Sequence, residues 1–472
     1  MRSRIDWKYL LALDLTDAGF DHSVLCEFRG RLLQHKATER LLDRVLGAAR
    51  DGGLLKARGR QRTDSTHVLA AVRTLNRLEL VGETLRAALN AIAVVAPDWL
   101  RSVAPADWHE RYDRRVEDMR PPESEPKRDA YFVQVGADGF LLIGIMDGAD
   151  VPPDAAALPA VAVLRRVWTR HFERAQWDPN GSTPQGVQLR ALQARGPGER
   201  VESPYDTEAR FRTKRDMNWI GYMAHFTETC DKGAPHLVVH TDTTPANVHE
   251  AMRTEPIHAA LVAKNLTPAE HLVDAAYVSA EHLLGARERY GIDLVGPPRR
   301  DVSWQRQSED AFGVSDFVVD WERQRVRCPA GKESTHWGEY VAKGRGPCVK
   351  IGFRRSDCAT CPLQAQCTRT RGNGRRLTLH PRPEHDALAA ARAREQTEAG
   401  RQLYSQRQGI EGTLSQGVRV FGLRQARYRG LAKVGLQIVA SAAVLNLDRL
   451  GAWFTKRSLA GTRISRFAAL AA

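Results

Sequence analysis

Apolar residues recur at helical spacing through the first 55 residues of the chain. The run LLQHKATERLLDRVLGAAR, residues 32–50, repeats leucine and valine every three or four positions, and Gly52 and Gly53 end it. The next segment, LLKARGRQRTDSTHVLAAV, fits a strand that leads to a turn at Asp64, although its periodicity alone does not separate a strand from a helix. Residues 1–55 are therefore predicted to be helical.

The middle of the chain combines long helical patterns with a strand-rich segment. Residues 75–200 look mostly helical and contain proline-bearing polar stretches at 120–129 and 147–159, which is typical of an inserted helical region. Residues 215–300 then alternate between strand and helix patterns: MNWIGYMAHFTE, PHLVVHT, HLVDAAYV and GIDLVG as strands, with two helices between them. This alternation predicts an α/β sheet with right-handed crossovers.

The last third of the chain contrasts an irregular segment with a helical one. Residues 301–385 show no regular period and contain most of the cysteines, whereas the pattern from residue 385 onward is helical. A final apolar helix is predicted around VGLQIVASAAVLNLDRL, residues 434–450. No repeat of fixed period is visible.

Composition and charge narrow the class of protein. The 472 residues are 42% hydrophobic, and no unbroken apolar stretch approaches the roughly 18–20 residues that cross a bilayer. No export signal is recognised at the N-terminus, so a cytoplasmic protein without membrane contact is expected. The net charge of +14 favours a polyanionic partner such as nucleic acid, and residues 419–472 hold ten Lys and Arg against one acid, Asp448.

Three widely separated acids are candidates for metal-dependent chemistry on phosphodiesters. Asp64 precedes a Ser-Thr-His segment, Asp274 lies within the apolar HLVDAAY, and Glu411 lies on a predicted helix. Hydrolysis without a covalent intermediate needs metal ions that activate the attacking oxygen and neutralise the leaving one, and Mg²⁺ or Mn²⁺ prefers a few oxygen ligands. Asp242, in HTDTTPAN, is the main rival to Asp274, although its Thr-Thr-Pro context fits the start of a loop better.

Three segments resemble bacterial insertion-sequence transposases that carry a DDE carboxylate triad. They are RTDSTHV, VDAAYVSAEHL and YSQRQGIEGTLSQGVRVFGLRQARYRGLAK. The resemblance implies that Asp64, Asp274 and Glu411 are the catalytic residues and hold two Mg²⁺ or Mn²⁺ ions. It also implies an RNase H-like fold: a mixed sheet flanked by helices, here with a helical insertion and a Cys-rich irregular insertion.

The third motif of the family has the form Y-x2-R-x3-E-x6-K. Tyr404, Arg407 and Glu411 match it at spacings that place them along one helical face, but Val418 stands where the lysine is expected and Arg419 follows it. The resemblance implies that Arg407 braces Glu411 or contacts phosphate and that Tyr404 helps to position DNA. Residues expected to support DNA binding are Arg419, Arg424, Arg427, Arg429 and Lys433.

Five of the seven cysteines fall within 40 residues, which suggests metal binding. Cys358, Cys361 and Cys367 supply three thiolates and Cys328 a fourth, a set that suits a closed, structural Zn²⁺ site. Cys348 or His336 could replace Cys328 as the fourth ligand, and a group of free thiols is the alternative.

These patterns predict a division of the chain into five regions. An N-terminal helical region for DNA binding covers 1–55, a helical insertion 76–204, a Cys-rich insertion 301–384 and a basic tail 451–472. The catalytic core is assembled from 56–75, 205–300 and 385–450. Relatives usually carry further helices before the segment that corresponds to residues 4–33, so a shortened N-terminus is expected.

The leading interpretation is an enzyme that binds the terminal inverted repeats of its own element, cleaves the DNA and transfers the freed 3′-OH ends to target DNA. Its partners would be transposon-end and target DNA, with a homodimer in the DNA complex. Two alternatives stay open: a non-catalytic DNA-binding protein derived from a truncated transposase, and a stand-alone RNase H-like nuclease. The acid triad favours activity, whereas the short N-terminus favours binding alone.

Overall fold

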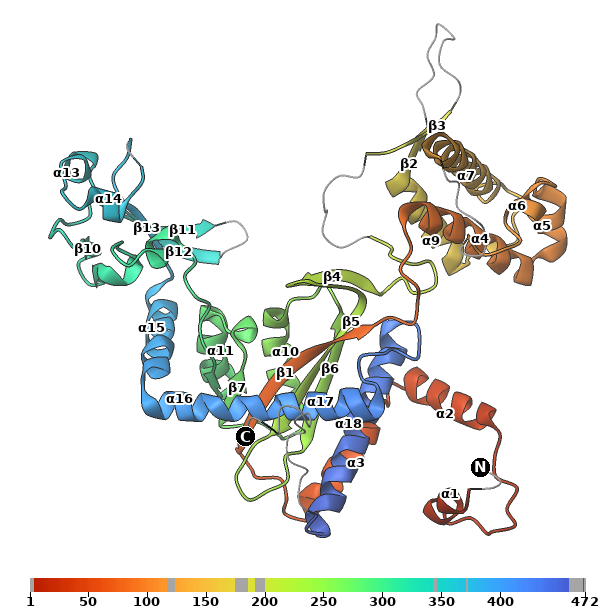
Figure 1. Cartoon of the computed structure of the whole chain (residues 1–472), viewed down its shortest axis with the longest axis horizontal. Coiled ribbons are helices and arrows are strands. Elements are labelled where there is room, and N and C mark those ends of the chain that lie inside the picture. Colours follow the sequence, from red (N-terminus) through yellow and green to blue (C-terminus); the bar gives the residue numbers. More distant parts are fainter. Residues whose placement is uncertain are drawn as a thin grey trace, which may run out of the picture.

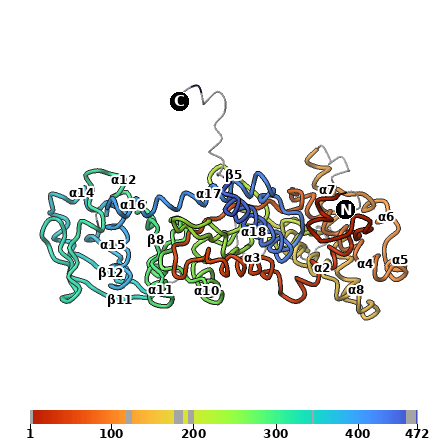
Figure 2. Tube along the Cα trace, turned by 90° about the horizontal axis from the view of Figure 1, so that it is seen from below, coloured from red at the N-terminus to blue at the C-terminus, as the bar shows by residue number. Residues whose placement is uncertain are grey.

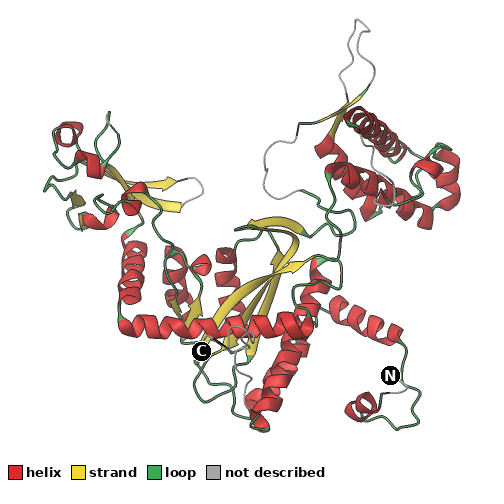
Figure 3. Ribbon diagram, in the orientation of Figure 1, coloured by secondary structure: helices red, strands yellow, loops and turns green. Residues whose placement is uncertain are grey.

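The computed structural model describes residues 4–116, 124–174, 186–191, 200–342, 346–370, 372–457 and 470. A curled sheet lies at the centre, with a helical unit and a cysteine-bearing unit extending from it on opposite sides (Figure 1). The view from below places the same two units at opposite ends of the molecule (Figure 2). Helices and strands are mixed throughout, so the prediction of an α/β protein is confirmed (Figure 3).

The central sheet has six strands arranged around β1. Strands β6, β5, β1, β7 and β8 lie side by side in that order, and β4 pairs with the other end of β5. β5 is antiparallel to β1, β4 and β6, whereas β7 is parallel to both β1 and β8. The strands are β1 (Arg60–Leu69), β4 (Arg210–Lys214), β5 (Met217–Thr229), β6 (Val238–Pro245), β7 (Glu270–Val273) and β8 (Asp293–Val295).

The turn predicted at Asp64 is wrong. β1 continues through this position and pairs with β5 from Gln61↔Thr229 to Leu69↔Gly221. Its backbone groups are therefore satisfied by the sheet, and the polar Asp-Ser-Thr sequence occupies the middle of a central strand. The predicted strand at residues 271–278 is shorter than expected, because β7 ends at Val273 and Asp274 caps the 3-10 turn η3 (Ala275–Tyr277).

Helices cover both faces of the sheet. On one face, Thr63 hydrogen-bonds His271, which in turn bonds His258 of α10 (Thr254–Ala263). Residues of β1 on the other face contact the segment that leads into α17 (Gly409–Phe421). α11 (Ala280–Tyr290) connects β7 to β8, as the right-handed crossover pattern predicts.

The last long helix, α18 (Leu431–Phe454), is apolar because it packs on several neighbours. It lies against β6 and against α3 (Arg40–Asp51), and Val434, Ile438, Ala442 and Leu445 are buried in the main core. By length and composition alone α18 could cross a membrane, but half of its apolar window is buried inside the structure. The expectation of no membrane contact stays a prediction.

A helical unit with a core of its own separates β1 from β4. Its main helices pack around Leu85, Leu142 and Trp168, and Gly139 is required because a Cβ there would lie 2.0 Å from the Trp168 ring. A short hairpin of β2 (Phe172–Arg174) and β3 (Val187–Leu189) closes it. The helices are α4 (Arg77–Val95), α5 (Pro97–Val103), α6 (Trp108–Arg111), α7 (Glu125–Ile145), α8 (Pro153–Ala156) and α9 (Pro159–His171).

The segment predicted to be irregular, 301–385, contains two small sheets, so that prediction is wrong. Alternate residues of its strands, among them Val349, Ile351, Leu377 and Leu379, are buried in a separate core. The segment is short in apolar residues, which hid this alternation. Its strands are β9 (Val318–Asp320), β10 (Arg325–Arg327), β11 (His336–Ala342), β12 (Gly346–Gly352) and β13 (Arg376–Leu379). Its helices are α12 (Trp304–Gln307), η4 (Val314–Asp316), α13 (Arg355–Ala359) and α14 (Gln364–Cys367).

The two ends of the chain differ in how much of them is described. Residues 1–55 contain α1 (Ile5–Leu10), α2 (His22–Gln34) and α3, as the helical pattern predicts, and α2 has no buried residue. The predicted basic tail, 451–472, lies mostly outside the described residues, because α18 ends at Phe454 and only 455–457 and 470 follow. The predicted domain boundaries stay predictions.

A buried ion network joins the sheet to the two C-terminal helices. The Glu228 side chain on β5 is 0% exposed and accepts hydrogen bonds from Arg62 on β1, at 2.7 Å, and from Arg449 on α18, at 2.8 Å. Thr413 on α17 donates to the same carboxylate. Four elements therefore meet at one carboxylate.

We expect Glu228→Gln to lower the free energy of unfolding by about 3–5 kcal/mol, because it leaves two arginines buried without their counter-charge. Urea unfolding measures this change. Glu322→Gln is the matched control: Glu322 and Arg382 form an exposed pair, whose loss should cost under about 1 kcal/mol. Equal effects of the two substitutions would contradict the assigned role of the network.

A second prediction concerns the buried histidines. Burial lowers the pKa of His225, His240 and His258 to about 4. The unfolded chain therefore binds protons that the folded chain does not, so stability present above pH ~6.5 is lost as the pH falls toward 4.

We expect urea unfolding at pH 5.0 to give a free energy several kcal/mol below that at pH 7.5. His258→Gln should reduce this pH dependence, whereas replacement of the exposed His22 by Gln should leave it unchanged. A pH dependence that does not differ between wild type and His258→Gln would show that this histidine does not contribute.

Candidate active site and cysteine cluster

Asp64 and Asp274 lie at neighbouring positions on adjacent parallel strands. β1 and β7 pair up to Thr63↔Val273, and the two aspartates are the next residues of each chain segment, where strands are about 4.8 Å apart. Each carboxylate is oriented by a backbone N–H: that of Ser65 donates to Asp64 Oδ1 at 2.7 Å, and that of Ala275 to Asp274 Oδ1 at 2.6 Å. The structure thus brings together two acids that lie 210 positions apart in the sequence.

At the Asp64 carboxylate, the effect of burial outweighs that of the positive charge on Arg407. Burial raises its pKa, and the neighbouring Asp274 raises it further, while the Ser65 N–H and Arg407 lower it. The net shift is upward, so the ionised form is disfavoured at this position. A cation close to the pair would relieve that cost.

Arg407 links Asp64 to the third acid, Glu411. Its guanidinium donates to Asp64 Oδ2 at 3.0 Å through Nη1 and to Glu411 Oε1 at 2.9 Å through Nη2. The Arg407 side chain is 13% exposed, whereas that of Glu411 is 61% exposed. Glu411 therefore lies at the rim of the site and is joined to Asp64 through the arginine.

The predicted single helix that carries Tyr404, Arg407 and Glu411 is interrupted. α16 (Glu398–Ser405) ends, the 3-10 turn η5 (Gln406–Gln408) follows, and α17 begins at Gly409. The interruption lies where Arg62 donates to the Gln406 carbonyl at 2.5 Å. Gly409 is needed there, because a Cβ would lie 2.0 Å from the Arg62 guanidinium.

Tyr404 stands beside the same group of charges. Burial raises its pKa, and the charges of Asp274 and Asp64 raise it further, whereas Arg407 lowers it. Tyr404, Arg407, Asp64 and Asp274 are therefore close enough to interact, although the predicted helix that carries Tyr404 and Arg407 is interrupted.

Asp242, the rival acid, lies elsewhere. It is on β6 opposite His225, which is itself opposite Ser65, so the three share the sheet face that Asp64 does not occupy. Its carboxylate pairs with Arg253 at 2.6 Å. Asp242 does not join Asp64 and Asp274.

The basic loop, defined as residues 422–430 between α17 and α18, is fixed to the end of β1. The Leu69 N–H donates to the Arg424 carbonyl at 2.8 Å and the Ala426 N–H to the Leu69 carbonyl at 2.9 Å, as in a short parallel strand. Arg424 also donates to Thr66, two residues from Asp64. The exposed cations of this region are Arg419, Arg424, Arg427, Arg429 and Lys433.

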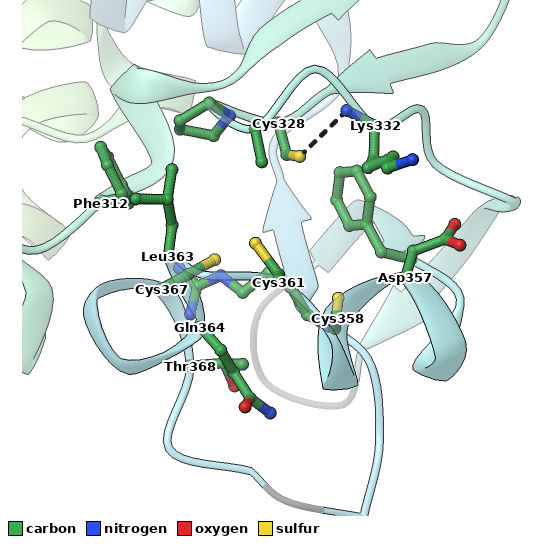
Figure 4. Close-up of a pocket in the computed structure, with 14 residues that line it drawn as sticks. Phe312, Cys328, Lys332, Asp357, Cys358, Cys361, Leu363, Gln364, Cys367 and Thr368 are labelled. Atoms are coloured by element: carbon green, nitrogen blue, oxygen red, sulfur yellow. Dashed lines mark hydrogen bonds between the residues drawn. The ribbon is translucent and has the colours of Figure 1, made fainter.

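Four cysteines line one small cavity in the cysteine-bearing unit. Cys328, Cys358, Cys361 and Cys367 surround a space of about 30 Å³, and Figure 4 shows their sulfur atoms turned toward it. The Lys332 and Arg375 backbone N–H groups donate to the sulfurs of Cys328 and Cys358 at 3.3 and 3.4 Å. Gly331, at φ +78°, allows the tight turn after Cys328.

The alternative fourth ligands are not at this cavity. Cys348 is buried on β12 and lines a different groove, and His336 on β11 contacts Tyr340. Burial raises the pKa of the Cys367 thiol, and Cys358, Cys328 and Cys361 raise it further, which indicates that the four sulfurs interact.

Sequence reasoning missed two residues that shape the carboxylate site, Arg62 and Glu228. Arg62 lies two positions before Asp64 on the same face of β1, and this period-two spacing is the sequence signal for its place beside the site. Glu228 lies at the end of a nearly continuous buried strand, and no sequence pattern distinguishes it from an exposed strand-end acid.

The donor chemistry of the carboxylate site suits a hard divalent cation, but the arrangement is incomplete. Asp64 and Asp274 offer neighbouring oxygen ligands, while the Glu411 carboxylate binds Arg407. Within the described ranges, no group of three or more His, Cys, Asp or Glu side chains has the geometry to hold a metal ion. The two aspartates fit the metal, and Glu411 would complete the set only after Arg407 moves.

A mixed sheet that carries two neighbouring acids, one within β1 and one directly after β7, with a basic loop beside them, is an arrangement suited to cutting a polyanion. Residues 327–451 match the family described as the transposase DDE domain, which supports a DDE transposase. That family acts on DNA and generally uses divalent metal ions. The match includes Tyr404, Arg407, Glu411, the four clustered cysteines and the basic loop, but begins after Asp64 and Asp274. No curated protein matches the chain.

Proposed function

We propose that this protein is a transposase that binds the terminal inverted repeats of an insertion sequence and catalyses metal-dependent DNA strand cleavage and strand transfer. The observation that carries the proposal is the placement of Asp64 and Asp274 side by side, with Glu411 joined to Asp64 through Arg407. The family match supports the same activity from the part of the chain that contains Glu411.

The strand order supports an RNase H-like core for this activity. An antiparallel meander, β1, β5 and β6, is followed by β7 and β8, which lie on the other side of β1 and parallel to it. In such a fold the acids gather at one face of the central strand; here Asp64 lies on that strand, Asp274 directly follows the neighbouring strand β7, and Glu411 is linked to Asp64 through Arg407. The helical unit and the cysteine-bearing unit are then insertions into that core.

Asp64, Asp274 and Glu411 would hold two Mg²⁺ or Mn²⁺ ions. Such ions activate the attacking oxygen and neutralise the leaving one. The chain's own residues position the DNA: Tyr404 and Arg407 beside the acids, and the cations of the basic loop along the phosphates. We also propose that the protein binds DNA as a homodimer and that it is cytoplasmic.

The cysteine cluster is proposed to hold one structural Zn²⁺ through Cys328, Cys358, Cys361 and Cys367. Support comes from the shared cavity and from the two backbone N–H groups that donate to the sulfurs of Cys328 and Cys358; the four thiols would have to draw closer together to bind the ion. A site with four sulfur ligands leaves no open position, so this ion would stabilise the unit without taking part in catalysis.

Asp274→Asn should abolish nicking, because it keeps the side-chain shape but removes a charge that faces the metal ions. The assay follows nicking of a supercoiled plasmid that carries this coding sequence with its genomic flanks, in Mg²⁺ or Mn²⁺. DNA affinity in a gel-shift assay should hold or rise, since an anion near the phosphates is gone.

Asp242→Asn is the control for this experiment, because that acid lies on the other sheet face and should leave nicking intact. Loss of nicking in the Asp242 variant alone would assign the chemistry to the rival acid. Wild-type protein that binds DNA without ever cutting it would favour a non-catalytic DNA-binding protein.

For the basic loop we expect the reverse of the Asp274→Asn result: DNA binding should weaken while nicking is retained. Replacing Arg424, Arg427 and Arg429 of the loop, together with Lys433 next to it on α18, by Gln should weaken binding to any DNA sequence and reduce the log-log salt slope by about 0.9 per lost phosphate contact. Nicking at saturating DNA should be largely preserved. An equal change of charge on the helical unit is the control, and an equal loss of affinity there would contradict a specific role of the loop. The control replaces Arg101, Arg128, Arg165 and Arg166 by Gln.

Zinc should co-purify at about one ion per chain, a stoichiometry that metal analysis measures. Cys361→Ser should lose the ion and unfold the cysteine-bearing unit while the central sheet stays intact. Cys348→Ser is the matched control, since that thiol lies outside the cavity, and it should retain zinc. A folded, fully reduced sample without zinc would refute the site.

A further inference from the structure

The Arg407 guanidinium lies between two of the carboxylates that the proposed function assigns to metal ions. It donates to Asp64 Oδ2 and Glu411 Oε1 at 3.0 and 2.9 Å. The other Asp64 oxygen accepts from the Ser65 N–H. Arg407 is therefore a cation bound to the acids themselves, and it is 13% exposed.

The local charges show that this contact is a favourable one. The guanidinium is only 13% exposed and donates to both carboxylates within 3.0 Å, so its positive charge is paired on two sides. Asp64 in turn is 19% exposed and lies beside a second aspartate, and Arg407 supplies the positive charge next to it. Any divalent ion that binds here must compete with the guanidinium for the same oxygen atoms.

DNA offers Arg407 another partner. The basic loop meets β1 at Leu69 and Thr66, so a phosphate that follows its cations arrives within a few residues of Asp64. A planar guanidinium pairs with phosphate through two parallel hydrogen bonds, as it does with carboxylates. Arg407 can thus exchange its carboxylate partners for a phosphate without a loss of paired charge.

We propose that Arg407 is a latch on the carboxylate site: it competes with divalent metal for Asp64 and Glu411, and it releases them when it binds a DNA phosphate. Metal loading then depends on DNA. The inference rests on the proposed function, because it takes Asp64 and Glu411 as metal ligands and DNA as the partner. Competition for shared oxygens and reciprocal linkage between DNA and metal are its two measurable consequences.

The test measures Mn²⁺ binding by the full chain, from the electron paramagnetic resonance signal of free Mn²⁺, with and without a short DNA duplex. Without DNA, Arg407→Gln should bind Mn²⁺ about tenfold more tightly than wild type, within the usual range of coupling between sites. The duplex should tighten Mn²⁺ binding by wild type and have little further effect on Arg407→Gln.

Arg401→Gln is the matched control. Arg401 lies on α16, forms an exposed pair with Glu398 at 3.0 Å, and carries the same charge outside the site. Its replacement should leave Mn²⁺ affinity close to that of wild type. Arg407→Lys, which keeps the charge but not the forked geometry, should give an intermediate affinity and provides a second variant if the glutamine protein does not fold.

Unchanged or weaker Mn²⁺ binding by Arg407→Gln would overturn the latch, as would an equal gain in Arg401→Gln. Asp274→Asn separates this inference from the proposed function. If wild type binds Mn²⁺ and Asp274→Asn does not, the site is established and only the latch is at stake. If no variant binds Mn²⁺ even with DNA, the proposed function fails together with the latch.

Discussion

The Glu228 carboxylate is the interaction on which the geometry of the carboxylate site depends. It is fully buried, and it is bonded to Arg62 on β1, to Arg449 on α18 and to Thr413 on α17. Thr413 lies two residues after Glu411, so this network sets how far the helix of the third acid stands from the strand of the first. A charged network in this position fixes where the two helices lie on the sheet. Apolar packing alone would leave the helices free to slide along it.

The face of β1 that carries Asp64 contacts the C-terminal part of the chain at every second residue. Arg60 and Arg62 both bond Gln406, Asp64 bonds Arg407, and Thr66 accepts from Arg424. The period of two is that of a strand, and the partners lie first on the η5 turn and then on the loop after α17. A segment more than 300 residues away in sequence is thereby aligned with β1 residue by residue.

The sequence was informative where chemistry and local pattern coincide. The alternation over residues 215–300 predicted the crossover units, whereas the single helical face predicted for Tyr404, Arg407 and Glu411 is interrupted by the η5 turn. It failed at Asp64, because an Asp-Ser-Thr segment has turn propensity and only the pairing of β1 with neighbours on both sides overrides it. It could not reveal Glu228, since burial of that acid depends on partners from three distant elements.

The position of the helical unit has a consequence for how the chain folds. Leu69 and Arg210 both pair with Gly221, so the segment 70–209 leaves and rejoins the sheet at the same residue of β5. If this segment were unstructured, closing so long a loop would oppose the β1–β5 pairing entropically. Because the unit has its own core, its folding can hold the two ends near each other and turn a distant strand pairing into a nearly local one. The assembly of the face that carries Asp64 is therefore kinetically tied to a unit that supplies none of the three acids.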